Sequence, residues 1–375
     1  MARPKIALAA NDSWNIVNYR AGLIRSLHDA GYDIVVLASE GAHSRDVRRL
    51  GVEFHPVPMQ ARGKSPVSDL ALLLRYWREL KAIRPAAFLG FTAKPNIYGS
   101  LAAGWCGEPV INNISGLGAA FVRRGLLRRV VEGLYRLALR RSATVFFQNT
   151  DDRDLFVARR IISPGQAALL PGSGVDLAHF TPVARADGES STFLLAARLL
   201  WDKGVGEFVE AARRLRTNFP NAEFHILGII EDAGASAVPE SQLQAWVDEG
   251  IIDYLGAADD VRPFFAASDC VVLPSYYREG VPRVLLEAAA MGIPVITTTT
   301  PGCREAVEDG VTGLLCDPRS IDSLAAAMAR LVRMDLKQRN AMGAAGRAKM
   351  EAEFREDIVH RAYIAALGKL GLATS

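Results

Sequence analysis

The sequence of 375 residues lacks several features that mark special classes of protein. It has no run of 18 apolar residues, and the five apolar residues before Asn11 are too few for a signal peptide, so we expect at most peripheral contact with a membrane. The net charge of +3 is too small to indicate nucleic acid as a partner. The four cysteines form no Cys-x-x-Cys pair, which is typical of reduced thiols in a cytosol.

The length and the periodicity of the chain predict two domains. One hydrophobic core rarely supports a chain of this length. Short apolar strands alternate with helical segments, such as residues 19–30 and 70–83, and this rhythm favours mostly parallel sheets covered on both faces. We expect strands at residues 5–10, 33–39, 53–58, 86–91, 109–114, 144–149 and 167–170, and then at 192–198, 223–228, 252–256, 269–274, 294–299 and 313–316. The fold class is therefore α/β, with two doubly wound, Rossmann-like domains.

A polar segment, residues 181–191, interrupts this alternation and carries Pro182 and Gly188. We interpret it as the linker between a domain of residues 1–180 and a second domain. Ligands of such sheets bind beyond the carboxyl ends of the strands, so two sheets that face each other predict a ligand cleft.

The most informative stretch is residues 269–294, which predicts a buried strand, a polar loop and a helix opened by Pro282. The first N–H groups of such a helix have no intrahelical partner and attract anions. Glu279 lies in the loop, and Glu287, the sixth residue of the expected helix, lies about 7.5 Å further along its axis. These carboxylates either accept hydrogen bonds from ligand hydroxyls or are solvated surface side chains.

A second strand end supplies positive charge. In the segment A-A-R-L-L-W-D-K-G-V, Arg198 closes an apolar strand and Lys203 precedes Gly204, where the next helix is expected to begin. A cation at a helix N-terminus is unfavourable by about 0.3–1 kcal/mol, so Lys203 is better explained by an anionic ligand, such as a diphosphate, than by helix stability.

Several segments in one order and spacing resemble the donor half of the retaining family 4 glycosyltransferases of the GT-B fold. They are A-R-L-L-W-D-K-G, H-I-L-G (225–228), Y-L-G (254–256), the Glu279-x7-Glu287 pair and G-C-R-E-A-V-E-D-G-V-T-G-L-L (302–315). The resemblance implies that Arg198 and Lys203 hold the diphosphate of a nucleotide sugar, with Glu279 at the sugar hydroxyls and Glu287 at the ribose. Gly204, Gly280, Val281 and Pro282 complete the donor-binding residues that it implies.

The resemblance also implies an organisation of the chain. Residues 1–180 form an acceptor-binding domain, residues 181–355 bind the nucleotide sugar, and the helix within 356–375 packs back on the first domain. The segment P-G-S-G-V-D-L-A-H-F (171–180) resembles the crossing between domains in this family.

The segments A-A-R-L-L-W-D-K-G-V-G-E-F, F-Q-N-T-D and S-G-L-G-A-A-F resemble bacterial N-acetylgalactosaminyltransferases that extend undecaprenyl-diphosphate-linked sugars. This implies a UDP-sugar donor, a polyprenyl-diphosphate-linked glycan acceptor, no metal and no other cofactor, and a place at the cytoplasmic face of the membrane. Candidate acceptor-binding residues are Asn11, Lys94, Asn113, Arg123, Arg124 and Arg128.

The segment 121–142 is rich in arginine. Helical spacing predicts an apolar face of Leu127, Val130, Val131, Leu134, Leu137 and Ala138, opposite a basic face of Arg128, Arg129, Arg136 and Arg140. The basic face is solvated, or else Arg123 to Arg129 contact anionic lipid or an acceptor pyrophosphate.

Two motifs imitate other functions. G-L-G-A-A-F (116–121) lacks the third glycine of a dinucleotide site, and no acidic residue follows at the required spacing. Asp152-Arg153-Asp154 spells the metal-binding D-x-D, but Thr150 followed by acids is also a helix N-cap, which we prefer. A transferase with a soluble acceptor, an epimerase or phosphorylase of this fold, and a non-catalytic nucleotide-sugar-binding subunit remain alternatives.

Overall fold

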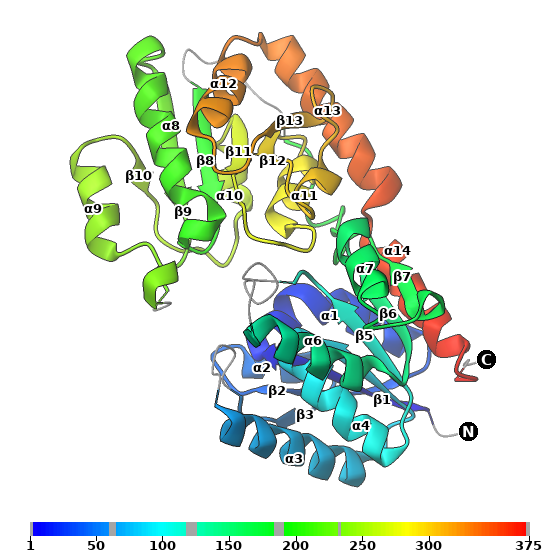
Figure 1. Cartoon of the computed structure of the whole chain (residues 1–375). Helices are drawn as coiled ribbons and strands as arrows, with labels where there is room; N and C mark the ends of the chain where they lie inside the picture. The colour runs from blue at the N-terminus through cyan, green and yellow to red at the C-terminus, as the bar shows by residue number, and fades with distance from the viewer. Residues whose placement is uncertain (1–2, 60–64, 118–125, 184–190, 232–233, 373–375) are drawn as a thin grey trace. The chain divides into compact units, whose positions relative to one another are not determined.

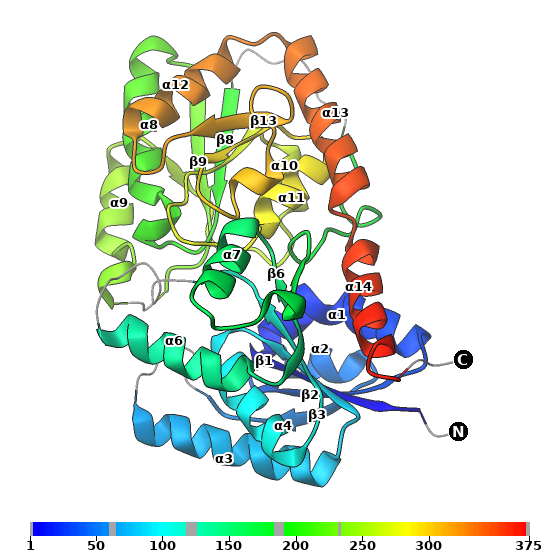
Figure 2. The same cartoon turned by 45° about the vertical axis from the view of Figure 1, so that its right-hand side comes forward.

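The computed structural model describes residues 3–59, 65–117, 126–183, 191–231 and 234–372 (Figures 1 and 2). The chain divides into two compact units: Met1–Ser173 with Glu356–Ser375, and Gly174–Arg355. The second unit begins before the expected residue 181, because Val175 and Phe180 both belong to its hydrophobic core.

The polar segment 181–191 is not the point at which the chain passes between the units. Its first residues belong to the second unit, where the Val183 N–H donates to the carbonyl oxygen of Met291 at 3.3 Å, and residues 184–190 lie outside the described part of the chain. The chain passes from one unit to the other after Ser173 and again after Arg355. The residues that follow and precede these points lie side by side, since the Val175 N–H donates to the Phe354 carbonyl oxygen at 2.8 Å.

Seven parallel strands form the described sheet of the first unit, in the order β3-β2-β1-β4-β5-β6-β7. They are β1 (Lys5–Asp12), β2 (Asp33–Ser39), β3 (Glu53–Pro56), β4 (Ala87–Phe91), β5 (Val110–Ile114), β6 (Ser142–Phe147) and β7 (Ala167–Leu169). Successive side chains of β1 point to opposite faces, as strand geometry requires. The strand order reverses between β1 and β4, and ligands of such sheets bind at this switch point.

Helices cover both faces of this sheet. Ile6 and Leu8 of β1 share a core with α1 (Ser13–Asp29) and α14 (Glu356–Gly368), whereas Ala7 and Ala9 share another with α3 (Pro66–Ile83) and α4 (Ser100–Cys106). The remaining α-helices described in this unit are α2 (Ser44–Arg49), α6 (Leu126–Leu139) and α7 (Thr150–Ala158). Asn149, and not Thr150, is the N-cap of α7, because the Asp152 N–H donates to its side chain at 2.8 Å.

The second unit repeats this architecture with six described strands in the order β10-β9-β8-β11-β12-β13. They are β8 (Ser191–Ala196), β9 (Ala222–Leu227), β10 (Asp253–Tyr254), β11 (Cys270–Leu273), β12 (Val295–Thr298) and β13 (Gly313–Cys316). The described α-helices are α8 (Val205–Asn218), α9 (Glu240–Asp248), α10 (Arg262–Ala266), α11 (Arg283–Ala290), α12 (Ile321–Val332) and α13 (Leu336–Glu353). The predicted fold class of two doubly wound parallel sheets is confirmed, and the switch point of this sheet lies between β8 and β11.

The last helix, α14, completes the core of the first unit. Tyr363 and Val359 are buried in the same core as the residues of α1 and β1. The Tyr363 hydroxyl accepts a hydrogen bond from Asn113 Nδ2 at 2.8 Å, and its ring lies 4.9 Å from that of Phe146. Although residues 174–355 separate this helix from the rest of the unit in sequence, it belongs to the first unit in space.

Candidate active site

Lys203 and Glu279 form an ion pair at the switch point of the second sheet. Lys203 follows β8 in a short turn, Trp201–Lys203, and Glu279 lies in the loop after β11. The two side chains are only 12% and 13% exposed, and Ser275 Oγ donates to Glu279 Oε1 at 2.9 Å. The structure thus brings together two of the predicted catalytic residues, which are 76 positions apart.

Backbone contacts fix the loops that carry this pair. The carbonyl oxygen of Asp202 accepts hydrogen bonds from the N–H groups of Tyr276 and Tyr277, each at 3.1 Å. Gly204 has φ +79°, and a Cβ atom there would lie 2.3 Å from the carbonyl oxygen of Pro274. Only glycine permits both this conformation and this approach. Gly204, a predicted donor-binding residue, therefore also holds the β8 and β11 loops together.

Arg198 lies near this pair in sequence but has a different partner. Its Nη1 atom is 3.3 Å from Glu231 Oε1, and the side chain is 45% exposed. A guanidinium that is half exposed keeps donors available for a phosphate. Its predicted contact with a diphosphate stays a prediction.

The predicted anion site at the start of α11 differs in one detail. The helix begins at Arg283, so Pro282 is its N-cap rather than its first residue, with φ −67° and ψ 122°. Because ψ is extended at this residue, the helix begins one position later than expected. The first N–H groups of a helix have no carbonyl four residues earlier within the helix, and here the Leu285 N–H donates to the Pro282 carbonyl oxygen at 3.2 Å.

Gly302 packs against the loop before α11. It has φ +93°, and a Cβ atom would lie 2.0 Å from the Gly280 carbonyl oxygen. Its N–H donates to Glu305 Oε2 at 2.6 Å. The segment 302–315, noted for its resemblance to family 4 glycosyltransferases, thus packs directly against the backbone of Gly280.

Glu287 is the fifth residue of α11, and it has a partner that sequence reasoning missed. Arg283, one turn earlier, lies 2.8 Å from Glu287 Oε1, and the carboxylate is only 13% exposed. Burial raises the pKa of the Glu287 carboxyl, and the guanidinium of Arg283 opposes this rise. The i,i+4 spacing of a helix could have suggested this pair. The role of Glu287 at a ribose stays a prediction.

Two apolar side chains lie exposed at neighbouring strand ends of the same sheet. Ile229 follows β9 and Leu255 follows β10, and the Gly228 N–H donates to the Gly256 carbonyl oxygen at 2.8 Å. Exposed apolar side chains at the ligand edge of a sheet can pack against a flat ring. Neither residue was predicted from the sequence, because H-I-L-G and Y-L-G were noted only for their resemblance to a family and Ile229 lies just outside the first of them.

Two of the candidate acceptor-binding residues, Asn11 and Lys94, lie near the switch point of the first sheet. Asn11 is the last but one residue of β1, its Nδ2 donates to Asp12 Oδ2 at 2.7 Å, and its Oδ1 is buried without a hydrogen-bond partner in the described structure. Lys94, beyond the end of β4, pairs with Asp69 at 2.7 Å. Asn11 lies near the carboxyl end of β1 and Lys94 follows β4, and these two strands form the switch point of this sheet.

The remaining acceptor candidates have structural partners or lie outside the described residues. Asn113 is fully buried and donates to Tyr363, so it belongs to the core rather than to a ligand site. Arg128 and Arg159 both donate to Glu132 Oε1 at 2.8 Å, and the side chain of Arg128 is mostly buried. Arg123 and Arg124 lie outside the described part of the chain.

The faces of α6 also differ from the prediction. Val130 and Leu137, expected on the buried face, are 52% and 60% exposed. They share the outer face with the exposed Arg129, Arg136 and Arg140, because the buried stripe of this helix is narrower than the apolar pattern of the sequence.

No group of three or more His, Cys, Asp or Glu residues that could hold a metal ion occurs within the described ranges. Among the same residues, we find no helix that has both the length and the apolar character needed to cross a membrane.

Two parallel, doubly wound sheets, with a Lys–Glu pair and a helix N-terminus at the switch point of one, are typical of proteins that bind a phosphate-containing ligand at this edge of the sheet. Comparison with known families assigns residues 16–173 to the glycosyl transferase 4-like domain and residues 180–349 to the glycosyl transferases group 1. The chain belongs to these glycosyltransferases, and the predicted enzyme class is confirmed.

Curated relatives extend over most of the chain. N,N'-diacetylbacillosaminyl-diphospho-undecaprenol alpha-1,3-N-acetylgalactosaminyltransferase of Campylobacter jejuni is 24% identical over 377 aligned positions, which cover 96% of this chain and 97% of that protein. UDP-Gal:alpha-D-GlcNAc-diphosphoundecaprenol alpha-1,3-galactosyltransferase of Escherichia coli is 26% identical and covers 80% of each chain.

Solved structures share the fold. Sucrose-phosphate synthase from Thermosynechococcus elongatus superimposes with a TM-score of 0.81 at 19% identity and covers 99% of this chain and 100% of that one. HepE of Anabaena in complex with UDP-glucose gives a TM-score of 0.79 at 18% identity over 98% of this chain and 100% of that one. The predicted GT-B fold is thus confirmed.

Proposed function

We propose that the protein transfers a sugar, an N-acetylhexosamine or a hexose, from a UDP-sugar to a lipid-diphosphate-linked glycan during assembly of a bacterial surface polysaccharide or glycan. The Lys203–Glu279 pair at the switch point carries this proposal, because it offers a cation for a phosphate and a carboxylate for sugar hydroxyls at one place. The Campylobacter and Escherichia relatives are named for transfer to undecaprenol-diphosphate-linked sugars, which supports the choice of acceptor.

The donor would lie along the carboxyl ends of β8, β9 and β11. A lysine ammonium has three donors, so Lys203 can bind a phosphate oxygen while it remains paired with Glu279. Arg198 and the backbone N–H groups of Val281, Arg283 and Val284 would supply the remaining positive charge. Protein groups alone would then neutralise the charge of the diphosphate. Because no metal ion is needed for this, we expect turnover to persist in the presence of EDTA.

The nucleoside would occupy the adjoining strand ends. Glu287, held in place by Arg283, would accept hydrogen bonds from the ribose hydroxyls. The exposed side chains of Ile229 and Leu255 would pack against the base. This arrangement runs from the base at β9 and β10 to the sugar at Glu279.

The reaction would proceed with retention of the anomeric configuration. The sugar–phosphate bond breaks, and the departing diphosphate, stabilised by Lys203 and Arg198, accepts the proton of the acceptor hydroxyl that attacks on the same face of the sugar. A preorganised site lowers the activation barrier most when its fixed charges stabilise the leaving group. Glu279 would hold the sugar and act neither as nucleophile nor as base.

In the first unit, the acceptor would meet Asn11 and Lys94. Two side-chain oxygens are buried and accept no hydrogen bond from any described group. They are Oδ1 of Asn11 and Oδ1 of Asn15, which lies in the first turn of α1. An unpaired buried acceptor is costly, and donor hydroxyls of a glycan would satisfy it. Arg123 and Arg124 remain candidates for the acceptor diphosphate on the basis of sequence alone.

We also propose a peripheral place at the cytoplasmic face of the membrane. Val67, Leu70 and Leu74 lie exposed on one side of α3, and Val130 and Leu137 lie exposed among the arginines of α6. Apolar side chains mixed with basic ones are typical of surfaces that contact anionic lipid, where each basic residue adds about 1 kcal/mol. A lipid-linked acceptor is reached most directly from such a position.

One experiment tests the transferase proposal. Purified protein is incubated with a panel of UDP- and GDP-sugars and an undecaprenyl-diphosphate-linked saccharide, and mass spectrometry detects the extended product. We expect one UDP-sugar to be used, and NMR of the product to give the same anomeric configuration as the donor. The control is the same saccharide without its lipid diphosphate.

Each other outcome points to one of the alternatives. Equal rates with the free saccharide would indicate a soluble acceptor. A changed or cleaved donor without any acceptor would indicate an epimerase or a phosphorylase, and donor binding without turnover would indicate a non-catalytic subunit.

A further inference from the structure

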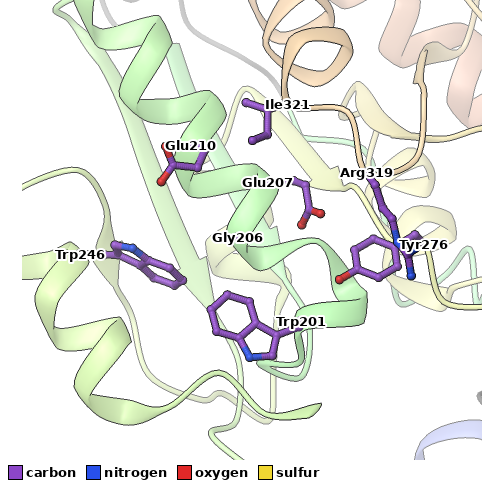
Figure 3. Close-up of a pocket in the computed structure, with 8 residues that line it drawn as sticks. All are labelled: Trp201, Gly206, Glu207, Glu210, Trp246, Tyr276, Arg319 and Ile321. Carbon is purple, nitrogen blue, oxygen red and sulfur yellow. The ribbon is translucent and has the colours of Figure 1, made fainter. Parts of the chain in front are cut away.

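A cavity of about 410 Å³ lies in the second unit, between the turn after β8 and the helices α8, α9 and α12 (Figure 3). Aromatic and charged side chains line it together: Trp201, Trp246, Tyr276, Glu207, Glu210 and Arg319. Arg198, Lys203, Glu279 and Glu287 are not among the lining residues. The cavity is therefore a feature separate from the proposed donor contacts.

The two tryptophans form its aromatic wall. Their ring centroids lie 5.9 Å apart with the ring planes at 90°, so the edge of one indole meets the face of the other. Trp246 is buried in the core, whereas Trp201 is partly exposed to the cavity. This packing fixes the orientation of Trp201 and leaves it as a rigid apolar surface.

Arg319 is held over the cavity at a conformational cost. Its backbone has φ +58°, the left-handed region that non-glycine residues rarely adopt. Its guanidinium carbon lies 4.4 Å from the centroid of the Tyr276 ring, a cation–π contact. A strained backbone that positions a polar group in a cavity is characteristic of ligand-binding sites.

Two carboxylates, those of Glu207 and Glu210, line the cavity and disfavour an anionic ligand. Glu207, in the first turn of α8, is half-buried, and burial raises the pKa of its carboxyl while the charge of Arg319 opposes this rise. Glu210, one turn further, pairs with Arg213. Two carboxylates line the cavity against one guanidinium, so a phosphate would be repelled, whereas an uncharged polyol could bond to both kinds of group.

We propose that this cavity binds one uncharged sugar ring, at a site separate from that of the donor nucleotide. The apolar face of a pyranose would pack on Trp201, its hydroxyls would donate to Glu207, and Arg319 would donate to its ring or hydroxyl oxygens. The volume lies within the range of about 300–1,000 Å³ that is typical of small-molecule sites. The site requires no turnover and so goes beyond the proposed function.

The test uses protein labelled with ¹⁵N at its five tryptophans and saturated with UDP, so that the donor site is filled. The probes are the methyl glycosides of glucose, galactose, N-acetylglucosamine and N-acetylgalactosamine, together with inorganic phosphate. The indole signals of Trp201 and Trp246 are assigned by Trp→Phe replacement and followed during titration. The test variants are Glu207→Gln, which removes the charge, and Arg319→Gly, which removes the guanidinium and suits the left-handed backbone.

Arg160→Gly is the matched control, because Arg160 also has a positive φ, 52°, but lies in the first unit. We expect at least one glycoside to shift the Trp201 signal with a millimolar dissociation constant. Both test variants should raise that constant about tenfold or more, and the control should leave it unchanged.

Several results would overturn the proposal. They are a lack of any shift with all four glycosides up to about 50 mM, a stronger response to phosphate than to the sugars, or unchanged affinity in both test variants. None of these depends on transferase activity, so failure of this inference and failure of the proposed function are distinguishable.

Discussion

The ammonium of Lys203 and the carboxylate of Glu279 meet between two loops that leave neighbouring strands of one parallel sheet. The pair is largely buried, and Ser275 and the Asp202 carbonyl oxygen tie the same two loops together. Neutralisation of Glu279 by Lys203 allows a carboxylate to lie beside a diphosphate, which it would otherwise repel. The roles of these two residues are therefore linked.

Lys203→Ala should lower kcat by about 10²–10³-fold, because the cation that stabilises the leaving group is lost, while the dissociation constant for UDP rises much less. Steady-state kinetics and calorimetry with UDP separate the two effects. The comparison variant is Glu287→Ala, which should raise the donor KM about tenfold or more and change kcat little. Equal changes in kcat and KM in both variants would contradict this division of roles.

Gly204→Ala should weaken donor binding and lower stability by more than the cost of a positive φ alone. The new Cβ atom would lie 2.3 Å from the Pro274 carbonyl oxygen and force the β8 and β11 loops apart. Gly250→Ala is the matched control, because its φ of +69° is similar but no atom lies within 4 Å of the added Cβ. Thermal denaturation and UDP calorimetry should give a larger loss for Gly204→Ala; equal losses would show that the contact between the loops is unimportant.

The sequence predicted the fold more completely than it predicted the domain boundary or the contacts of the site. Alternating strands and helices identify the two sheets because that periodicity follows directly from burial. The polar segment 181–191 does not mark the passage between the units, because a polar composition reports exposure to solvent. The passage after Ser173 lies instead within residues 171–180, the segment noted for its resemblance to an interdomain crossing, and it depends on the core that receives Val175. The prediction that Val130 and Leu137 lie on the buried face of α6 was wrong for a related reason. A helical pattern does not reveal how much of an apolar stripe other elements cover.

The individual residues of the site were accessible from sequence, but their pairing was not. Motifs suggested Arg198, Lys203, Glu279 and Glu287 as site residues, and their roles stay predictions. The contact between Lys203 and Glu279 could not be suggested in this way, because it depends on the strand order, which places β8 beside β11. Asn113 was misjudged because its partner, Tyr363, lies 250 residues away. Long-range contacts of this kind cannot be predicted from local spacing.

Glu108 should make stability depend on pH. Burial raises the pKa of its carboxyl to about 7, and its Oε2 atom is buried without a hydrogen-bond partner among the described residues. Because the folded pKa exceeds the unfolded value of 4.5, its contribution to stability is complete below pH 4.5 and is lost as the pH rises through 7. The loss should be at most about 1 kcal/mol, since solvent screens a half-buried group.

Glu108→Gln removes this dependence without changing the shape of the side chain. Its Tm should exceed that of the unchanged protein at pH 8 and equal it at pH 4.5. A gain of the same size at both pH values would show that ionisation of Glu108 is not the cause.

The outer faces of α3 and α6 should bind anionic vesicles. We expect the protein to float with vesicles that contain phosphatidylglycerol and not with phosphatidylcholine alone. Leu70→Ser with Leu74→Ser should weaken this binding by removing apolar contact, and Arg136→Gln with Arg140→Gln should weaken it by removing charge. Leu169→Ser, at an exposed leucine of β7, is the control and should have no effect. Flotation that is indifferent to lipid charge and to all four substitutions would exclude this surface as the membrane contact.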